Sequence, residues 1–254
     1  MPKTGQASRE RVASTQRSLA ILDVLAPETA LGTNEIARRL GTTPSTVSRQ
    51  LGTLVEAGLV ERVDASGQYR LGIRLVELAT RVLSRLDVRT VAHPHLEALV
   101  ADVGETATLS VPATPDAVTV DIVRSPHYVQ GASELGRPSV AHATAAGKVM
   151  LAFAGPLPTA PLVAYTERTI TDRAALAAEL ERVRRRGWAD AYEEREQSLN
   201  AIAAPVWASD RTLAGIVALQ GPVPRFGRAA ARAAVPVLVE RTAAISAELG
   251  SESR

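Results

Sequence analysis

Three polar side chains spaced four residues apart are the first candidates for chemistry in this chain: Ser45, Arg49 and Thr53. If residues 44–57 form a helix, this spacing places all three on one face of it. An arginine in such a position can contact a guanine base through two hydrogen bonds, and hydroxyl groups can reach phosphates or base edges. The spacing therefore predicts the groove-facing side of a DNA-recognition helix.

The remaining side chains of this segment agree with that interpretation. Two more hydroxyl residues flank the polar face near its start: Thr46 and Ser48. The opposite side of the segment is apolar: Val47, Leu51, Leu54 and Val55. A recognition helix needs one packed face and one polar face. The pattern leaves open one alternative, a three-helix packing module whose polar face is only solvated.

A second set of residue types could support hydrolysis. Ser110 or Thr144 could act as a nucleophile, His142 as its base, and Glu193 or Asp190 as the acid that orients the base. The chain has no Gly-x-Ser-x-Gly motif, and a histidine at the entrance to a helix commonly has a structural role. A small-molecule hydrolase that uses His142 with a Ser or Thr nucleophile therefore remains the enzymatic alternative.

Metal and nucleotide sites have weaker support. His93 and His95 are separated by a proline and have few carboxylates nearby. Lys148 follows a glycine, but a phosphate-binding loop would need glycine where His142 stands and Ser or Thr where Val149 stands. The absence of cysteine excludes disulfides, thiol nucleophiles and thiolate ligands. We predict no metal and no cofactor, and a structural or interface role for Lys148.

Charge and composition set broader limits. Residues 1–90 carry 13 Lys and Arg against 9 Asp and Glu, which makes the first third net +4 and the rest net −2. This asymmetry is a mild indication of a polyanionic partner at the N-terminal end. No run of about 18 apolar residues is present, and the first residues lack the apolar core of a signal peptide. We expect a cytoplasmic protein that does not bind membranes.

The elements around the polar face predict a winged helix. After a disordered stretch over residues 1–13, a helix runs from about residue 14 until Pro27 stops it. Thr33 caps a short helix over residues 34–40, and Gly41 ends it. Thr43 caps the next helix, with Pro44 at its first position, where the missing N–H is not needed.

A hairpin completes this N-terminal unit. Strands are expected over residues 59–63 and 68–71, joined by a turn in which Gly67 can adopt positive φ. Further DNA contacts are expected from the hairpin, which forms the wing, and from the start of the first helix: Arg62, Gln68, Arg70, Thr15 and Arg17.

Residues 73–88 follow without proline or glycine, which predicts one continuous helix. Its apolar residues form a heptad-like stripe: Leu75, Ala79, Val82 and Leu86, widened by Val76, Leu78 and Leu83. A helix this apolar must bury more than one side. We interpret it as a linker that also pairs two copies of the chain.

The rest of the chain reads as α+β. Helices are expected over 93–103, 144–153, 172–186 and 228–249, with a weak one after the proline-rich residues 155–161. Pro236 is expected to kink the last helix or mark its true start. Strands are expected over 105–111, 117–124, 128–133, 187–193, 199–207 and 212–220. The predicted domains are 1–72 for DNA binding, 73–88 as the linker and 89–254 as a ligand-binding domain.

Several short stretches carry a resemblance to a known family. In the first unit, residues 33–41 read Thr-Asn-Glu-Ile-Ala-Arg-Arg-Leu-Gly, 45–51 Ser-Thr-Val-Ser-Arg-Gln-Leu, 58–62 Gly-Leu-Val-Glu-Arg and 69–72 Tyr-Arg-Leu-Gly. Farther on, 94–96 read Pro-His-Leu, 104–106 Gly-Glu-Thr, 135–137 Leu-Gly-Arg, 142–148 His-Ala-Thr-Ala-Ala-Gly-Lys, 200–206 Asn-Ala-Ile-Ala-Ala-Pro-Val and 221–222 Gly-Pro. From these motifs the chain resembles the IclR-type family of bacterial transcription regulators over about residues 14–249.

That resemblance implies a dimer or a dimer of dimers, a double-stranded DNA operator, and a GAF-like effector domain with a mainly antiparallel sheet. Repression of a neighbouring operon is the commonest mode of regulation in the family, and the effector is often an organic acid or an aromatic compound. Carried over by motif, the effector-binding residues are Tyr128, Gly131, Ala145, Ala146, Gly147, Asn200, Ala201, Ala218 and Gln220. A signalling adaptor that does not bind DNA is a further alternative, but it would leave Arg49 and the basic wing without a use.

The chain departs from well-known members of that family at the pocket. Ala201 stands where cysteine can occur, Ala218 and Gln220 where serines can occur, and Ala191 where an acid can occur. These changes favour a larger, flatter and less polar effector, of aromatic size, over a small oxoacid. No Arg or Lys is among the inferred residues, so a doubly charged acid would be buried without a counter-charge.

Overall fold

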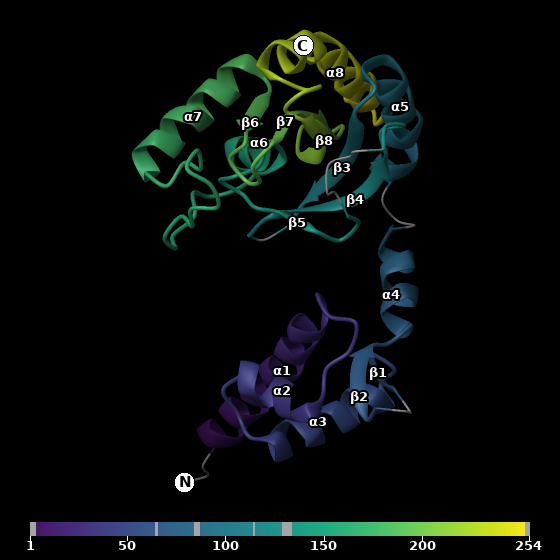
Figure 1. Cartoon of the computed structure of the whole chain (residues 1–254), viewed down its shortest axis with the longest axis vertical. Helices are drawn as coiled ribbons and strands as arrows, with labels where there is room; N and C mark the ends of the chain where they lie inside the picture. Colours follow the sequence, from purple (N-terminus) through teal and green to yellow (C-terminus); the bar gives the residue numbers. More distant parts are fainter. Residues whose placement is uncertain (1–3, 64–65, 84–86, 114, 129–133, 252–254) are drawn as a thin grey trace. The chain divides into compact units, whose positions relative to one another are not determined.

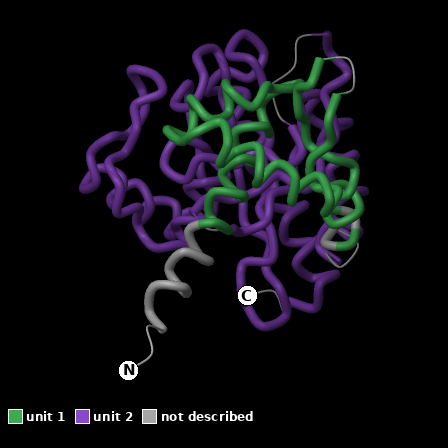
Figure 2. Tube along the Cα trace, turned by 90° about the horizontal axis from the view of Figure 1, so that it is seen from below, with its two compact units in different colours: residues 1–85 green, residues 86–254 purple. Residues whose placement is uncertain are grey.

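A computed structural model describes residues 4–63, 66–83, 87–113, 115–128 and 134–251, and their side chains from residue 14 on except those of 80, 82 and 83. The chain divides into two compact units, residues 1–85 and 86–254 (Figure 2). Among the described residues, no helix is both long and apolar enough to cross a membrane.

The first unit consists of three helices, a hairpin and a fourth helix (Figure 1). The helices are α1 (Thr4–Leu25), α2 (Thr33–Arg39), α3 (Pro44–Glu56) and α4 (Arg74–Leu83). Strands β1 (Val60–Val63) and β2 (Gln68–Leu71) pair antiparallel, with Val60 opposite Leu71. The core among α1, α2, α3 and the hairpin is made of aliphatic side chains: Ile21, Leu25, Leu31, Ile36, Ala37, Val47, Leu51, Leu54 and Val60.

Local signals explain how α3 begins. Thr43 adopts an extended conformation, and its hydroxyl oxygen accepts a hydrogen bond from the backbone N–H of Thr46. Pro44 occupies the first helical position, as predicted. Gly67 in the wing turn has φ of +65°, and Gly41 after α2 has φ of +60°. Both glycines therefore sit where a side chain would be strained.

Two sequence predictions in this unit are wrong. Residues 1–13 were expected to be disordered, but α1 already begins at Thr4, because no proline follows it before Pro27. Thr33 was expected to cap α2, but it is the first residue of that helix. Gly32 holds the cap position and provides no side-chain hydrogen bond.

The second unit is built on a six-stranded sheet in the order β5-β4-β3-β8-β7-β6, in which every described pair is antiparallel. The strands are β3 (Thr106–Pro112), β4 (Ala117–Val123), β5 (Pro138–Ser139), β6 (Ala189–Tyr192), β7 (Leu199–Trp207) and β8 (Leu213–Pro222). The fold class is therefore α+β with an antiparallel sheet, as predicted.

Two pairs of helices cover the two faces of this sheet (Figure 1). One face packs on α5 (Asp87–Val103) and α8 (Arg228–Glu248). The other packs on α6 (Ala145–Phe153), which in turn contacts α7 (Arg173–Arg186). The core on the α6 side is rich in alanine, which brings the helix close to the sheet.

Several predicted boundaries in this half differ from the structure. The expected helix 73–88 is α4 over Arg74–Leu83; residues 84–86 lie outside the described ranges, and residues 87 and 88 belong to α5. Helix α5 therefore starts six residues before the expected 93, with Pro94 inside it. Pro94 is exposed, while Ala92, Leu96 and Leu99 are fully buried and hold the helix on the sheet.

The remaining differences are smaller. Tyr128, the first residue of the third expected strand, lies in a bend, and the rest of that prediction, residues 129–133, lies outside the described ranges. A short strand that was not predicted, β5, follows at Pro138–Ser139. The proline-rich residues 155–161 lead into a segment without a helix until α7. Pro236 lies inside α8, which begins at Arg228, so it does not mark the start of that helix.

Candidate functional site

The polar face of α3 is exposed, as its spacing predicted. Ser45, Ser48, Arg49 and Thr53 are all solvent-exposed, while Thr46 is half-buried against the cap. The hydroxyl of Thr43 contacts those of Ser45 and Thr46, at 3.1 and 2.9 Å. Among the contacts of the described residues, Arg49 has no ion pair or hydrogen bond through its side chain. Its guanidinium is therefore available to an external partner.

The wing also presents polar side chains to solvent. Arg62, Gln68 and Arg70 are exposed on β1 and β2, with Arg70 3.2 Å from Glu61. Thr15 and Arg17 are exposed on α1. These residues and the α3 face belong to the same unit, so the predicted DNA contacts lie on one compact module.

The arginines of α2 are engaged differently. Arg38 and Arg39 both donate hydrogen bonds to the carboxylate of Glu35. These bonds, led by that from Arg38, lower the pKa of Glu35 to about 2. Arg39 also pairs with Glu28 at 2.7 Å. The two arginines therefore stabilise α2 and its contact with the preceding loop, in contrast to Arg49.

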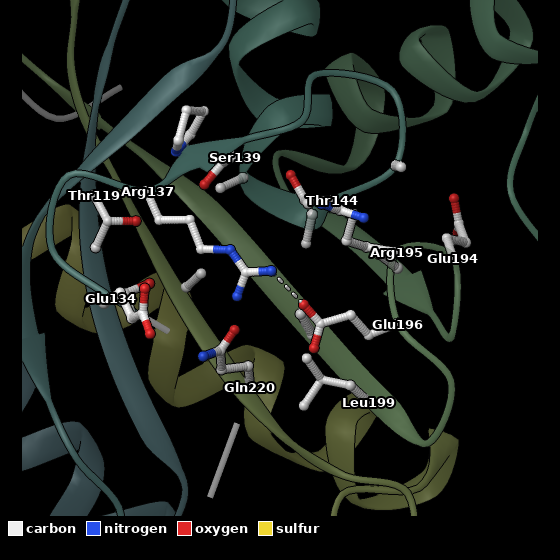
Figure 3. A pocket seen from close by; sticks show the side chains of 18 residues that line it. Thr119, Glu134, Arg137, Ser139, Thr144, Glu194, Arg195, Glu196, Leu199 and Gln220 are labelled. Carbon is white, nitrogen blue, oxygen red and sulfur yellow. Dashed lines mark hydrogen bonds and ion pairs between the residues drawn. The ribbon is translucent and has the colours of Figure 1, made fainter. Parts of the chain in front are cut away.

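The second unit contains a cavity of about 80 Å³ on the α6 side of the sheet (Figure 3). Its floor comes from neighbouring strands: Thr108, Thr119, Ala191, Leu199, Ala201, Ala218 and Gln220. Its walls come from the start of α6 and the segment before it, from β5 and from two loops: Ala143, Thr144, Ala145, Ala146, Pro138, Ser139, Glu134, Arg137, Glu194, Arg195 and Glu196. The cavity therefore joins the sheet to the start of a helix.

Five of the nine residues predicted for an effector line this cavity: Ala145, Ala146, Ala201, Ala218 and Gln220. The first two begin α6, where Thr144 caps the helix by accepting a hydrogen bond from the N–H of Gly147 at 3.0 Å. The first N–H groups of a helix have no partner within it and carry a partial positive charge. This wall of the cavity is therefore suited to an anion or a carbonyl oxygen.

Two other predicted residues have structural roles instead. A Cβ atom on Gly147 would lie 2.5 Å from the carbonyl oxygen of Val140, so this glycine lets α6 pack closely on the preceding turn. Asn200 donates a hydrogen bond to the carbonyl of Phe226 at 2.8 Å. Successive strand residues point to opposite faces, so when Ala201 faces the cavity, Asn200 faces away.

The last two predicted residues do not contribute to the described cavity. Tyr128 is fully exposed and does not line it. Gly131 lies outside the described residues.

The sequence reasoning missed the charged residues of the cavity, above all Arg137. Its guanidinium donates a hydrogen bond to Glu196 Oε1 at 2.7 Å. Figure 3 shows the side chain reaching across the middle of the cavity, between Thr144 and Gln220. The residues inferred for the effector included no Arg or Lys, whereas Arg137 and Arg195 line this cavity. Arg137 is part of the Leu-Gly-Arg motif at residues 135–137, and this motif is the sequence signal that could have identified it as a site residue.

Lys148 does not reach the cavity, although it follows the residues that do. Its ammonium donates hydrogen bonds to Glu194 Oε1 at 2.7 Å and to the carbonyl of Asp190 at 2.9 Å. Its side chain is 1% exposed and that of Glu194 10%. Burial raises the pKa of Glu194, against the opposing effect of Lys148. The pair thus ties α6 to the loop after β6.

The histidines singled out for catalysis or metal binding have other partners. His142 donates from Nε2 to a backbone carbonyl 2.9 Å away, and its ring lies 5.9 Å from that of Tyr165. His93 and His95 hydrogen-bond to carboxylates of two different elements. Within the described part of the chain, no group of three or more acidic or histidine side chains could hold a metal ion.

A second, larger cavity of about 460 Å³ lies beside the proline-rich segment. It is bordered mainly by residues 154–163 and by Pro112, Ala113, Pro115, Asp116, Ala141, His142 and Met150. Its polar groups are engaged: Asp116 accepts a hydrogen bond from the N–H of Ala141, and His142 is bound as described above. Among the described residues that border it, the polar side chains are few: Asp116, His142 and Thr159.

Comparison with known proteins agrees with both halves of the structure. Residues 14–64 match the model of the IclR helix-turn-helix domain, and residues 80–247 match that of the C-terminal domain of bacterial IclR transcriptional regulators. The glycerol operon regulatory protein of Streptomyces griseus is 34% identical over 248 residues, covering 94% of this chain and 97% of that protein. The regulator XynR of Escherichia coli K12 is 32% identical over 203 residues, covering 77% and 81%.

A solved structure gives the same result at the level of the fold. An IclR homologue from Microbacterium hydrocarbonoxydans, crystallised with 4-hydroxybenzoate, superposes with a TM-score of 0.77 at 28% identity, covering 93% of this chain and 98% of that one. The relatives are transcription regulators, which are not enzymes, so the hydrolase alternative is set aside. The chain belongs to the IclR family of bacterial transcription regulators, with the family's helix-turn-helix followed by its C-terminal domain.

Proposed function

We propose that this regulator is a repressor that binds a double-stranded operator as a dimer or a dimer of dimers, in the cytoplasm, where bacterial DNA lies. Residues 1–72 bind the DNA, 73–88 link and pair the chains, and 89–254 bind an effector of aromatic size. Binding of the effector in the cavity on the α6 side of the sheet changes operator affinity, because it favours one arrangement of the DNA-binding units.

The observation that carries this proposal is the composition of the cavity. The side chains of Ala201 and Ala218 on the floor are short and apolar, so they leave space for the ring of an aromatic ligand. Gln220, the start of α6 and Arg137 provide polar groups that can orient such a ligand. Among the described residues, the larger cavity beside the proline-rich segment is bordered by no arginine or lysine and by no start of a helix, so we assign it no effector.

A relative supports the ligand class. The Microbacterium homologue was crystallised with 4-hydroxybenzoate, a ring with one carboxylate and one hydroxyl. At 28% identity over most of both chains, its ligand is a reasonable first probe for this one.

Ala218→Leu tests the effector site. The side chain is buried and lines the cavity, so three added carbon atoms fill space that the effector needs. We expect calorimetric titration of the full chain with aromatic acids and amides to lose binding, by about tenfold or more. Operator affinity without ligand should stay unchanged, because Ala218 belongs to the other compact unit.

The matched control is Ala101→Leu, which adds the same atoms at an exposed position of α5. It should bind effector and operator as the original chain does. Tight binding of glyoxylate-sized acids, with none of aromatic acids, amides or hydrazides, would overturn the proposed effector class. Unchanged aromatic binding by Ala218→Leu would show that the ligand lies elsewhere.

Helix α4 is the proposed pairing element. Its charged residues share one side: Arg74, Glu77 and Arg81. Leu75 and Ala79 of the predicted apolar stripe lie on another side of the helix, and the two residues that flank this stripe, Val76 and Leu78, are 57% and 43% exposed. A solvent-exposed apolar face on a helix is stabilised when a partner covers it. Of the predicted stripe, the side chains of Val82 and Leu86 lie outside the described residues.

Val76→Glu combined with Leu78→Glu should therefore weaken assembly. The two carboxylates would lie on the two edges of the apolar stripe and would be desolvated in a paired state, which is unfavourable. We expect sedimentation to shift toward the monomer and operator affinity to fall, because one winged helix reads only one half-site. Arg74→Glu is the control, since it changes the net charge by the same two units on the polar face. A double variant that stays dimeric with full affinity would show that α4 does not assemble the protein.

A further inference from the structure

The effector cavity is smaller than its proposed ligand needs. At about 80 Å³ it lies well below the roughly 300–1,000 Å³ of ordinary small-molecule pockets. The floor is largely alanine, and the long side chains of Arg137 and Glu196 are among those that line the cavity. Figure 3 shows that Arg137 and Glu196 meet in the middle of the cavity. This ion pair is what a ligand must move.

We infer that Arg137 and Glu196 form a latch across the cavity, and that an aromatic ligand with one carboxylate opens it by taking the place of Glu196 on Arg137. This inference rests on the proposed function, because it concerns the same cavity. It goes further in two ways. It names two residues that determine ligand specificity, and it predicts that aromatic monocarboxylates bind better than uncharged aromatic compounds.

The exposure of the pair makes such an exchange possible. The side chains of Arg137 and Glu196 are 37% and 32% exposed, whereas the Lys148–Glu194 pair beside them is almost fully buried. A partly exposed ion pair contributes about 0–1 kcal/mol, and little is lost when one carboxylate replaces another. The buried pair cannot be exchanged in this way, because either charge would be left without a partner.

The backbone of the loop that carries Glu196 is fixed by contacts with its surroundings. A ligand therefore needs to displace only the side chain of Glu196. The hydroxyl of Thr169 donates to the carbonyl of Glu194. The guanidinium of Arg195 lies 4.0 Å above the ring of Tyr165. Glu193 and Ser198 have φ of +57° and +63°, a conformation that non-glycine residues adopt only where the surroundings impose it. The backbone thus presents Glu196 to the cavity while its side chain can turn to solvent.

The chemistry of the cavity favours a single carboxylate. Arg137 Nη2 donates to Glu196 Oε1, and an arginine can bind a carboxylate through two parallel hydrogen bonds, so the same guanidinium suits the carboxylate of a ligand. The start of α6 adds N–H groups that also favour an anion. Glu134 and Glu194 line the same space and oppose a second negative charge. A dicarboxylate is therefore excluded and a monocarboxylate is matched.

The test compares acids with amides of the same shape. The full chain, Arg137→Gln and Glu196→Gln are titrated calorimetrically with 4-hydroxybenzoate and 4-hydroxybenzamide, and with the benzoate and phenylacetate pairs. For Glu196→Gln we expect tighter binding of the acids, by up to about fivefold, because the competing carboxylate is gone. For Arg137→Gln we expect the acids to weaken by about tenfold or more, with the amides nearly unchanged.

Glu193→Gln is the control for charge, since it removes one carboxylate from the same loop without touching the cavity. It should leave the ratio of acid to amide affinity unchanged. Acids and amides that respond equally to Arg137→Gln, or an original chain that binds only amides, would overturn the latch and leave the proposed function standing. A chain that binds neither class in any of the three forms overturns the proposed function and the latch together.

Discussion

Arg49→Ala is expected to abolish sequence-specific operator binding while leaving the fold intact. Arg49 is exposed on the polar face of α3, and in the described part of the chain its side chain has no ion pair to lose. A bidentate contact to guanine contributes about 1–3 kcal/mol, which corresponds to roughly 5- to 150-fold in affinity for each half-site. In a dimer the loss applies at both half-sites.

The measurement is a gel shift on operator fragments first located by footprinting. Arg49→Lys is the informative partner variant, because it keeps the charge but cannot form the two parallel bonds. We expect it to retain non-specific affinity and lose specificity. Thermal unfolding of both variants should match the original chain. Undiminished, sequence-specific shifts with Arg49→Ala would mean that α3 is not the reading helix.

Lys148→Met is expected to destabilise the second unit by about 3–5 kcal/mol. The variant leaves the carboxylate of Glu194 buried without its cation, while Glu194 Oε2 already has no hydrogen-bond partner among the described residues. A protein of this kind has a total stability of about 5–15 kcal/mol, so the loss is a large fraction of it.

The chain offers a selective signal for this experiment. Its two tryptophans, Trp188 and Trp207, both belong to the second unit, so their fluorescence during urea unfolding reports on that unit. Lys148→Met with Glu194→Gln should recover much of the loss, because no buried charge remains. Arg185→Met removes an exposed cation from α7 and should change stability by less than about 0.5 kcal/mol.

The same variant should depend on pH in a defined direction. Burial already raises the pKa of Glu194, and removal of Lys148 raises it further. An acid whose pKa is higher in the folded state binds its proton more tightly there, so stability falls as the pH rises through that pKa. We expect Lys148→Met to be most damaging at alkaline pH and partly relieved at mildly acidic pH. An equal loss at both, with no rescue by Glu194→Gln, would mean that the ion pair has no such role.

Much of the first unit followed from local signals. Pro44 can stand at the start of a helix but not inside it, and a hydroxyl before it caps the helix, so the beginning of α3 was readable from two residues. The spacing of Ser45, Arg49 and Thr53 needed only the helical period to place them on one face. Gly67 identified the wing turn because its conformation excludes a side chain.

Tertiary packing overruled local signals elsewhere. Pro94 alone favours a helix that starts near it, but buried Ala92, Leu96 and Leu99 continue α5 through it. Asn200 and Ala201 belong to one motif, yet the strand turns them to opposite faces and only one reaches the cavity. Motif membership could identify the right segment, but it could not say which way each side chain points.

The sequence by itself determined the class of protein, through its family motifs, and it predicted the exposed polar face of α3, which depends only on residue type and on spacing within one element. Only the tertiary structure decided which charges meet. Lys148 and Glu194 are 46 residues apart in the chain, and Arg137 and Glu196 are 59 apart. Each pair is brought together by the order of strands in the sheet, which no local pattern encodes. The Lys148–Glu194 pair is buried and connects α6 to the loop after β6, whereas the Arg137–Glu196 pair is half-exposed and crosses the cavity.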